Sequence, residues 1–540
     1  MPILTISLPL FLYAEIHYRP RFLRGFLYRK QPEIIFDIPQ RIETDELPVA
    51  LIIKDSHKFP IELQSLSIDL IIDGKRKNRH RYYENKYIDS NFFSKIFPLK
   101  VKQYQGQYVK LEASLKYKTE KKEYQITNNN YPLLKNRNLS VYIDPDKRPQ
   151  PSNWKWGDMH CHSHYTEDQV EFGLPLHLIP EISRTMGLSF VAVTDHSYDL
   201  NNGEDSWIGT DVNLTKWYNM QKATRELNSK YKNFVLLPGE EVSTDNGLGK
   251  TVHMLVINNN EYIPGSGDSF EDGIRQKSEL QFNDILDNIP NKALALAAHP
   301  FETPSRIQSF FLKRGEWNIE NHHPNLAGYQ ILNGKKLNAF KRGKKKWIAQ
   351  LLKGKHKYIY AGNDSHGFLN RFISIQAPLI SLNNSDGHIF GEMLTAVKNT
   401  DNNVISITKG LQNNPVIISN GPFLEITIFN RNNRDIGPTL FDDNQIYKAE
   451  IGETLKGRPT SLQIKAESIP FFGKIKKISS YLADHNTKKE VLINTYSTDR
   501  YNFEKEISLT NLPKKGYIRS ELITSKEKFT LTNPVWFEEN

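Results

Sequence analysis

The chain has 540 residues, which is too long for one hydrophobic core, so we expect two to four domains. Hydrophobic residues make up 38% and aromatic residues 11%, as in globular domains, and no run of about 18 apolar residues predicts a transmembrane helix. The net charge of +10 includes the basic runs Lys75–Arg81 and Lys341–Lys346. Such runs can attract phosphate-bearing ligands, but no nucleic-acid-binding module is recognisable, and a lysine-rich bias favours solvated side chains.

The cysteine content indicates which cellular compartment the protein occupies. Cys161 is the single cysteine, so no intrachain disulfide can form. This favours a reducing, cytoplasmic location and leaves a secreted or periplasmic one open.

Residues 1–152 predict an N-terminal β-sandwich-like domain. Short runs of β-forming residues, such as ELPVALIIKD and QYVKLEASLKYK, are separated by turn residues. The segment DPDKRPQPSNWKW is rich in proline and charge, which is typical of a linker.

Residues 153–412 change to an alternation of strands and helices. Apolar strands such as SFVAVTDH, FVLLPGEEV and ALALAAHP alternate with helical segments such as LTKWYNMQKATRELNSKYK and KKWIAQLLKG. The pattern predicts the α/β class and a barrel-like arrangement of parallel strands. HIFGEMLTAVKN and ISITKGLQ predict a helix-rich stretch before a C-terminal β domain, residues 413–540.

The segment from Gly157 to Tyr165, GDMHCHSHY, is the strongest chemical signal. In a strand, side chains two residues apart lie on the same face, so His160 and His162 converge while Cys161 points the opposite way. Two imidazoles on one face are a start for a metal site, although a lone His-x-His motif is weak evidence.

Other ligand-type residues lie within or at the ends of the predicted strands. They are His196, Glu241, His253, His299 and the pair Asp364 and His366. Each has an ordinary structural explanation when taken singly. Burying them together without a cation would leave unpaired polar groups and repelling charges.

We therefore predict two or three divalent metal ions. The number of nitrogen and oxygen ligands exceeds what one ion needs, and mixed histidine and carboxylate ligands favour Mn, Fe or Zn. The absence of cysteine from the ligand positions argues against a closed structural zinc site.

The motifs GDMHCHSHYTED, FVAVTDHS, LLPGEEVS, VHMLVIN, AAHP, YQILNG and AGNDSHG together resemble the PHP (polymerase and histidinol phosphatase) superfamily, in its metal-dependent phosphoesterase branch. The resemblance covers about residues 153–412. It implies a distorted seven-stranded (β/α) barrel with a trinuclear metal site, flanked here by the β domains. SNGPFLEITI and the C-terminal strands resemble large multidomain members, some of which are similar to carbamate-ester hydrolases.

The resemblance implies a set of metal ligands, which are His160, His162, His196, Glu241, His253, His299, Asp364 and His366. Where the family usually has Ser-Asp-Gly, this chain has Thr166-Glu167-Asp168, so the remaining ligand is Glu167 or Asp168, and the register favours Glu167.

The predicted activity is hydrolysis of a small-molecule phosphoester by a hydroxide that bridges two metal ions. Asp195 or His164 is expected to supply a proton or to orient ligands, and Arg371 is the preferred phosphate-binding arginine, ahead of Arg184 and Arg306. Two alternatives remain: hydrolysis of a carbamate, ester or amide at the same metal centre, and a non-catalytic binding module.

Overall fold

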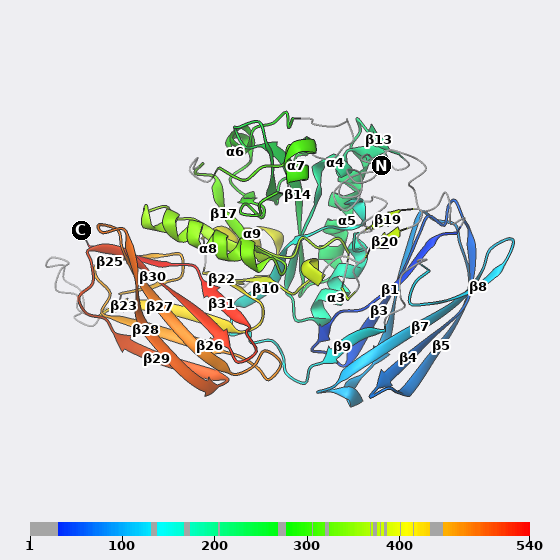
Figure 1. Ribbon diagram of the computed structural model, residues 1–540, viewed down its shortest axis with the longest axis horizontal. Coiled ribbons are helices and arrows are strands. Elements are labelled where there is room, and N and C mark those ends of the chain that lie inside the picture. The colour runs from blue at the N-terminus through cyan, green and yellow to red at the C-terminus, as the bar shows by residue number, and fades with distance from the viewer. Residues whose placement is uncertain are drawn as a thin grey trace.

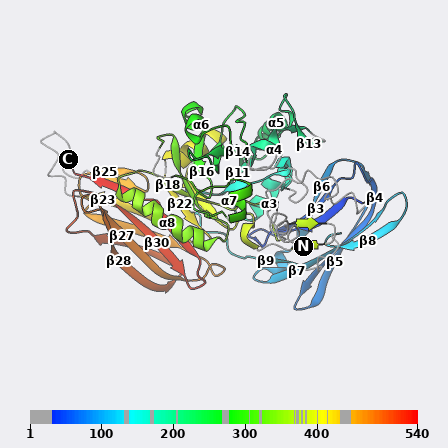
Figure 2. The same ribbon diagram turned by 45° about the horizontal axis from the view of Figure 1, so that its top comes forward.

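The computed structural model describes residues 31–130, 138–166, 173–203, 206–267, 277–304, 306–318, 323–367, 369–370, 375–377, 380–382, 386–399, 401–413, 415–431 and 447–539. Strands dominate this part of the chain, and β-rich units lie on either side of a central region that carries the helices (Figures 1 and 2). No helix among these residues is long and apolar enough to cross a membrane.

The N-terminal unit has two sheets, ordered β1-β3-β6 and β2-β9-β7-β4-β5, with β8 paired to β7. Their alternating apolar residues form a separate core that runs from Ile34 to Ile143. Its strands are β1 (Glu33–Asp37), β2 (Arg41–Ile42), β3 (Glu46–Lys54), β4 (Ile61–Ile72), β5 (Lys75–Ile88), β6 (Phe92–Lys100), β7 (Tyr108–Lys118), β8 (Glu123–Thr127) and β9 (Leu139–Ile143).

The central strands form one end of a fifteen-stranded sheet, in the order β18-β17-β16-β15-β14-β11-β10-β21. They are almost entirely buried and are rich in apolar residues, as expected for strands covered on both faces. Their bounds are β10 (Trp154–Cys161), β11 (Phe190–His196), β14 (Val235–Asp245), β15 (Thr251–Ile257), β16 (Leu294–Ala297), β17 (Leu326–Asn333), β18 (Tyr358–Gly362) and β21 (Leu394–Lys398).

Helices of this region cover the sheet and the ends of its strands (Figure 1). They are α3 (Ile179–Thr185), α4 (Ser197–Leu200), α5 (Thr215–Lys230), α6 (Phe282–Asn288), α7 (Arg306–Phe311), α8 (Leu337–Leu352) and α9 (Val404–Asn413). Two small hairpins pair β12 (Asn202–Gly203) with β13 (Ser206–Thr210), and β19 (Ile375–Ala377) with β20 (Ile380–Leu382). The predicted helix in HIFGEMLTAVKN is wrong, because that segment contains strand β21.

The large sheet continues from β21 into the C-terminal strands through β22 and β31. A second sheet in this region has the order β24-β23-β26-β29. The strands are β22 (Val416–Ser419), β23 (Phe423–Asn430), β24 (Tyr447–Glu450), β25 (Thr454–Lys456), β26 (Ser461–Glu467), β27 (Ile475–Asp484), β28 (Lys489–Arg500), β29 (Asn502–Ser508), β30 (Lys515–Thr524), β31 (Phe529–Thr532) and β32 (Val535–Glu538). The division at residue 413 stays a prediction, because one sheet runs through both sides of it.

The predicted α/β class and seven-stranded (β/α) barrel are wrong. The described chain is mainly β, and its central strands belong to a mixed sheet that extends into the C-terminal strands. β15 runs antiparallel to both β14 and β16, and β21 runs antiparallel to β10. Only residues 246–250 link β14 to β15, which is too short for the crossover that parallel strands need.

Candidate metal centre

Strand β10 places His160 and His162 in one buried cluster. Both side chains are fully buried, and their Nε2 atoms lie 3.1 Å apart. Cys161, between them, is buried in the hydrophobic core. The two ring nitrogens thus point at a common position, which is the arrangement that one strand provides for a shared cation.

The orientation of His160 is fixed from behind by Gln330 on β17. The His160 Nδ1 and the Gln330 Oε1 are 2.9 Å apart, and an amide oxygen can only accept a hydrogen bond. The ring proton therefore lies on Nδ1, which leaves the Nε2 lone pair directed into the cluster. Such a partner behind the ring is typical of metal-binding histidines.

Glu241, near the middle of β14, is the centre of the cluster. Its Oε2 lies 3.2 to 3.3 Å from ring nitrogens of His160, His162 and His196. Its Oε1 lies 2.6 Å from His253 Nδ1 and 3.0 Å from His299 Nε2. The buried Oε2 makes no hydrogen bond to any described residue, despite three nearby nitrogens. A cation between these atoms would satisfy them all.

Asp364 joins the cluster because the chain after β18 runs beside the end of β10. The Asp364 amide donates to the His160 carbonyl at 2.9 Å, and the His162 amide donates to the Ser365 carbonyl at 2.9 Å. The Asp364 Oδ1 lies 3.4 Å and 3.3 Å from the Nε2 atoms of His160 and His162. Asp364 has φ +51° and His299 has φ +29°, left-handed conformations that often mark functional sites.

The protonation states differ across the cluster. Burial alone would lower the pKa of His160 and His162, but Glu241 and Asp364 raise both, that of His162 to about 10, so a cation that binds these two rings displaces protons. Burial alone would raise the pKa of Glu241 and of Asp364, but the neighbouring histidines hold both well below the ordinary value. Burial lowers the pKa of His196 and His366 well below the ordinary value. Metal ligation requires ionised carboxylates and neutral imidazoles.

Three overlapping groups have ligand atoms within 4.8 Å of one another, so the residues present fit the predicted two or three ions. The groups are His162, His196 and His366; His160, His162, Glu241 and Asp364; and His196, Glu241 and His253. His299 lies beside them, at 3.0 Å from Glu241. The structure thus brings together all eight of the ligand candidates that it describes, and Glu167 and Asp168 lie outside the described residues.

The candidates for proton transfer lie elsewhere. Asp195, buried at the end of β11, accepts hydrogen bonds from Ser163 N at 2.6 Å, Ser163 Oγ at 2.7 Å and Thr166 Oγ1 at 2.9 Å. It therefore holds the turn that follows His162, which is a positioning role. His164 turns away from the cluster and its ring lies beside those of Tyr165 and Phe92.

The candidate phosphate-binding arginines do not meet at the cluster. Arg184 is exposed, with its guanidinium over the Tyr231 ring, and Arg306 is exposed at the start of α7. Arg371 lies outside the described residues. Sequence reasoning therefore did not identify the cations that do lie near the cluster.

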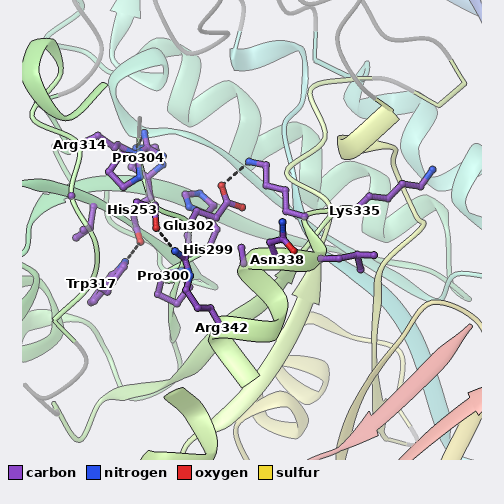
Figure 3. A pocket seen from close by; sticks show the side chains of 17 residues that line it. His253, His299, Pro300, Glu302, Pro304, Arg314, Trp317, Lys335, Asn338 and Arg342 are labelled. Atoms are coloured by element: carbon purple, nitrogen blue, oxygen red, sulfur yellow. Dashed lines mark hydrogen bonds and ion pairs between the residues drawn. The ribbon is translucent and has the colours of Figure 1, made fainter. Parts of the chain in front are cut away.

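A cavity of about 620 Å³ opens onto the cluster at His253 and His299 (Figure 3). Four basic residues line it: Arg314, Lys335, Lys336 and Arg342. Glu302 is the carboxylate among the lining residues, so the wall carries an excess of positive charge.

The basic side chains are held in place by specific contacts. Arg314 is buried and its Nη1 lies 2.9 Å from the Nε2 of His253. Lys336 Nζ pairs with Glu302 at 2.6 Å, and Arg342 donates to Thr303 Oγ1 and to the Phe301 carbonyl. Arg342 belongs to the basic run Lys341–Lys346, so a signal was present, but its place on a helix beside the cluster was not visible in the sequence.

Asn333, at the end of β17, connects the cavity with the cluster. Its Nδ2 donates to Glu302 Oε1 at 2.9 Å and to Asp364 Oδ2 at 3.2 Å, and its Oδ1 accepts from Gln330 Nε2 at 3.1 Å. The positions of the cavity wall and of two cluster residues, His160 and Asp364, are therefore set by one hydrogen-bond network.

Comparison with known proteins assigns no family. No family model matches the chain. No curated protein matches it either.

Some solved structures show faint likeness. A Bacteroides uniformis beta-glucuronidase is 9% identical with a TM-score of 0.17, over 94% of this chain and 61% of that chain. A putative beta-galactosidase from Bacteroides fragilis is 10% identical with a TM-score of 0.20, over 94% of this chain and 73% of that one. This chain thus spans about three fifths of the length of the first. TM-scores this low are no evidence of a shared fold, and these likenesses assign no activity.

Proposed function

We propose that this chain is a metal-dependent hydrolase of small-molecule phosphoesters. The observation that carries the proposal is the contact between the ligand cluster and the basic cavity, through His253, His299 and Arg314. A cationic wall beside the metal ligands is the feature that separates a phosphoester substrate from a neutral carbonyl substrate, because phosphate carries charge that guanidinium and ammonium groups bind.

The cluster residues fit the cation-binding part of this proposal. His160, His162, His196, Glu241 and Asp364 would hold the ions, which in such sites lower the pKa of water and neutralise charge on phosphoryl oxygens. Gln330 keeps the His160 lone pair directed inward, and Asp195 keeps His162 in place through the Ser163–Thr166 turn. These residues pre-arrange the centre before substrate enters.

The cavity residues fit the substrate-binding part. Lys336 immediately precedes α8, and Arg342 lies within that helix. Arg314 lies apart from Arg342, beside His253 (Figure 3). An anionic ester entering the cavity would meet these cations before it reaches His299. Glu302 stays ionised, since Lys336 and His299 lower its pKa against the effect of burial. It holds Lys336 and Asn333 in position.

The test is hydrolysis of a small panel by the manganese-loaded protein: an aryl phosphomonoester, an aryl phosphodiester, and aryl carboxyl and carbamate esters. We expect turnover of a phosphoester, lost in Asp364→Asn. Arg342→Met should raise KM for the phosphoester about tenfold, since one charge-assisted contact is lost.

Two results would contradict the proposal. Turnover of the carbon esters alone, unaffected by Arg342→Met, would indicate the carbamate, ester or amide hydrolase. If the protein hydrolyses none of these esters although elemental analysis shows that it holds its metal ions, the non-catalytic binding module is favoured.

A further inference from the structure

A second, smaller pocket lies where the N-terminal unit, the central region and the C-terminal strands meet. Its volume is about 90 Å³. Residues from all three parts line the pocket. Arg41 belongs to the N-terminal unit and Arg148 to the segment that follows it, Gly391 and Glu392 belong to the central region, and Lys528 lies among the C-terminal strands. Neither the proposed metal centre nor the basic cavity shares a residue with this pocket.

Arg148 is the main feature of the pocket. The side chain is buried, with 7% of the residue exposed, and its Nε and Nη1 make no hydrogen bond to any described residue. The guanidinium lies over the rings of Trp156 and Phe472, at 5.5 Å and 5.1 Å, and these rings offer no hydrogen-bond acceptor in their planes. A buried guanidinium with two nitrogens that donate to no acceptor is costly unless an acceptor reaches it.

Nearby carboxylates are engaged elsewhere. Asp144 and Glu43 pair with Arg41, at 2.6 Å and 3.1 Å. Glu43 also accepts the backbone amide of Arg148 at 2.7 Å. Glu392 pairs with Lys335 at 3.2 Å. These carboxylates therefore give the Arg148 Nε and Nη1 no hydrogen-bond acceptor, although Glu43 and Asp144 act on the guanidinium charge without such a bond.

Lys528 is a further cation in the lining of the pocket. Burial lowers the pKa of Lys528, and neighbouring Arg148 and Lys335 lower it further, against the opposite effect of Glu392. Burial lowers the pKa of Arg148 to about 9, and Arg41 adds to that effect, against the opposite effect of Glu43 and Asp144. Two desolvated cations facing one small volume attract an anion.

We infer that this pocket binds a small tetrahedral oxyanion, of the size of inorganic phosphate or sulfate, between Arg148 and Lys528. Guanidinium N–H groups match such oxygens in pairs, and the lysine adds a point charge. The volume admits one such ion or a few waters and excludes a larger organic phosphate.

The anion would connect the three parts of the molecule. Arg148 belongs to the segment between the N-terminal unit and β10, and Lys528 immediately precedes β31 of the C-terminal strands. Gly391, also in the lining, donates its amide to Asp158 Oδ2 at 3.1 Å, and Asp158 in turn accepts from Asn363 at 2.6 Å. Binding is thus expected to stabilise the junction that supports the end of β18.

The experiment is calorimetric titration of the full chain with phosphate, sulfate, acetate and chloride at matched ionic strength. The protein keeps its metal ions, and any oxyanion that binds at the proposed metal centre or in the basic cavity is recognised because Arg148→Met and Lys528→Met leave that binding unchanged. We expect phosphate and sulfate to bind at one further site that needs both Arg148 and Lys528 and to raise Tm, with acetate weaker and chloride inactive there. Arg148→Met and Lys528→Met should each weaken binding about tenfold or more, since each removes a charge-assisted contact.

Two matched variants locate the site. Lys526→Met removes an amine two residues away that bonds to the Pro470 carbonyl outside the pocket, and it should bind phosphate normally. Arg342→Met changes the basic cavity, so it should weaken any oxyanion binding there and leave intact the binding that depends on Arg148 and Lys528. If Arg148→Met does not fold, Lys528→Met alone decides the question.

Absence of oxyanion binding in the wild type would overturn the inference and leave the pocket to water. Loss of binding in Arg342→Met, with Lys528→Met unaffected, would also overturn it, by placing the anion in the basic cavity. Neither result depends on whether the chain hydrolyses phosphoesters.

Discussion

Two buried clusters of charged residues differ in how they are satisfied. In the C-terminal region, Arg519 is 2% exposed and donates to Glu490 through Nε at 2.8 Å and Nη2 at 2.7 Å. Its Nη1 bonds to Glu521, which Lys344 also contacts at 2.9 Å. At the proposed metal centre, by contrast, ring nitrogens of His160 and His162 face each other and lie close to Glu241.

The two clusters show which feature distinguishes a buried ion-pair network from a set of candidate metal ligands. Arg519 has donors matched to acceptors, so its cluster is complete and its pKa is raised. In the histidine cluster, by contrast, the Glu241 Oε2 has three ring nitrogens around it and makes no hydrogen bond to any described residue, and a cation would satisfy it. Burial and charge are alike in the two places, and only the donor and acceptor geometry separates an ion-pair network from a ligand set.

Metal removal should have the largest effect. A chelator should lower Tm strongly, because one ion at a thousand times its Kd stabilises by about 4 kcal/mol and two or three ions are expected. Mn²⁺ or Zn²⁺ should restore Tm, while Ca²⁺ should not, since imidazole ligands favour the former. Calorimetric scans with elemental analysis would check this. An unchanged Tm in protein shown to be metal-free would contradict the ligand assignment.

Arg519→Met should lower the free energy of unfolding by about 3 to 5 kcal/mol, because it leaves Glu490 buried without its partner. Denaturant unfolding measures this, and the bound metal should not change. Arg184→Met, which removes an exposed arginine, is the matched control and should have little effect. A metal content that falls in Arg519→Met would show that the two clusters are coupled.

Gln330→Leu tests the comparison at the proposed metal centre. It removes the acceptor that fixes the ring proton of His160 on Nδ1, so metal affinity should fall about 10- to 100-fold. Competition with a chelator of known affinity would measure the change. Gln412→Leu, which loses a bond to the Ala293 carbonyl far from the cluster, should bind metal normally. Equal affinities in the two variants would exclude a positioning role for Gln330.

His164→Ala should have the smallest effect. The side chain packs on Tyr165 and Phe92 outside the ligand groups, so the loss of stability should be about 1 kcal/mol or less. Metal content and turnover should match the wild type. A large loss of turnover at full metal content would restore the catalytic role that the sequence suggested for His164.

Local patterns in the sequence were enough to predict much of the proposed ligand set. The alternation in His160-Cys161-His162 separates two buried imidazoles from a core cysteine because side chains of a strand alternate between faces. The residues at the ends of apolar runs, such as Glu241 and Asp364, were predicted for a similar local reason. These inferences depend only on neighbours in the sequence.

Tertiary structure decided the rest. Apolar strands look alike whether their neighbours run parallel or antiparallel, so the sequence pattern suggested a barrel where β15 and β21 form a mixed sheet. The basic cavity and the pocket at Arg148 bring together segments that are distant in the sequence, as when Arg314 meets His253. Pairing direction and such encounters depend on long-range hydrogen bonds and packing, which no local pattern encodes.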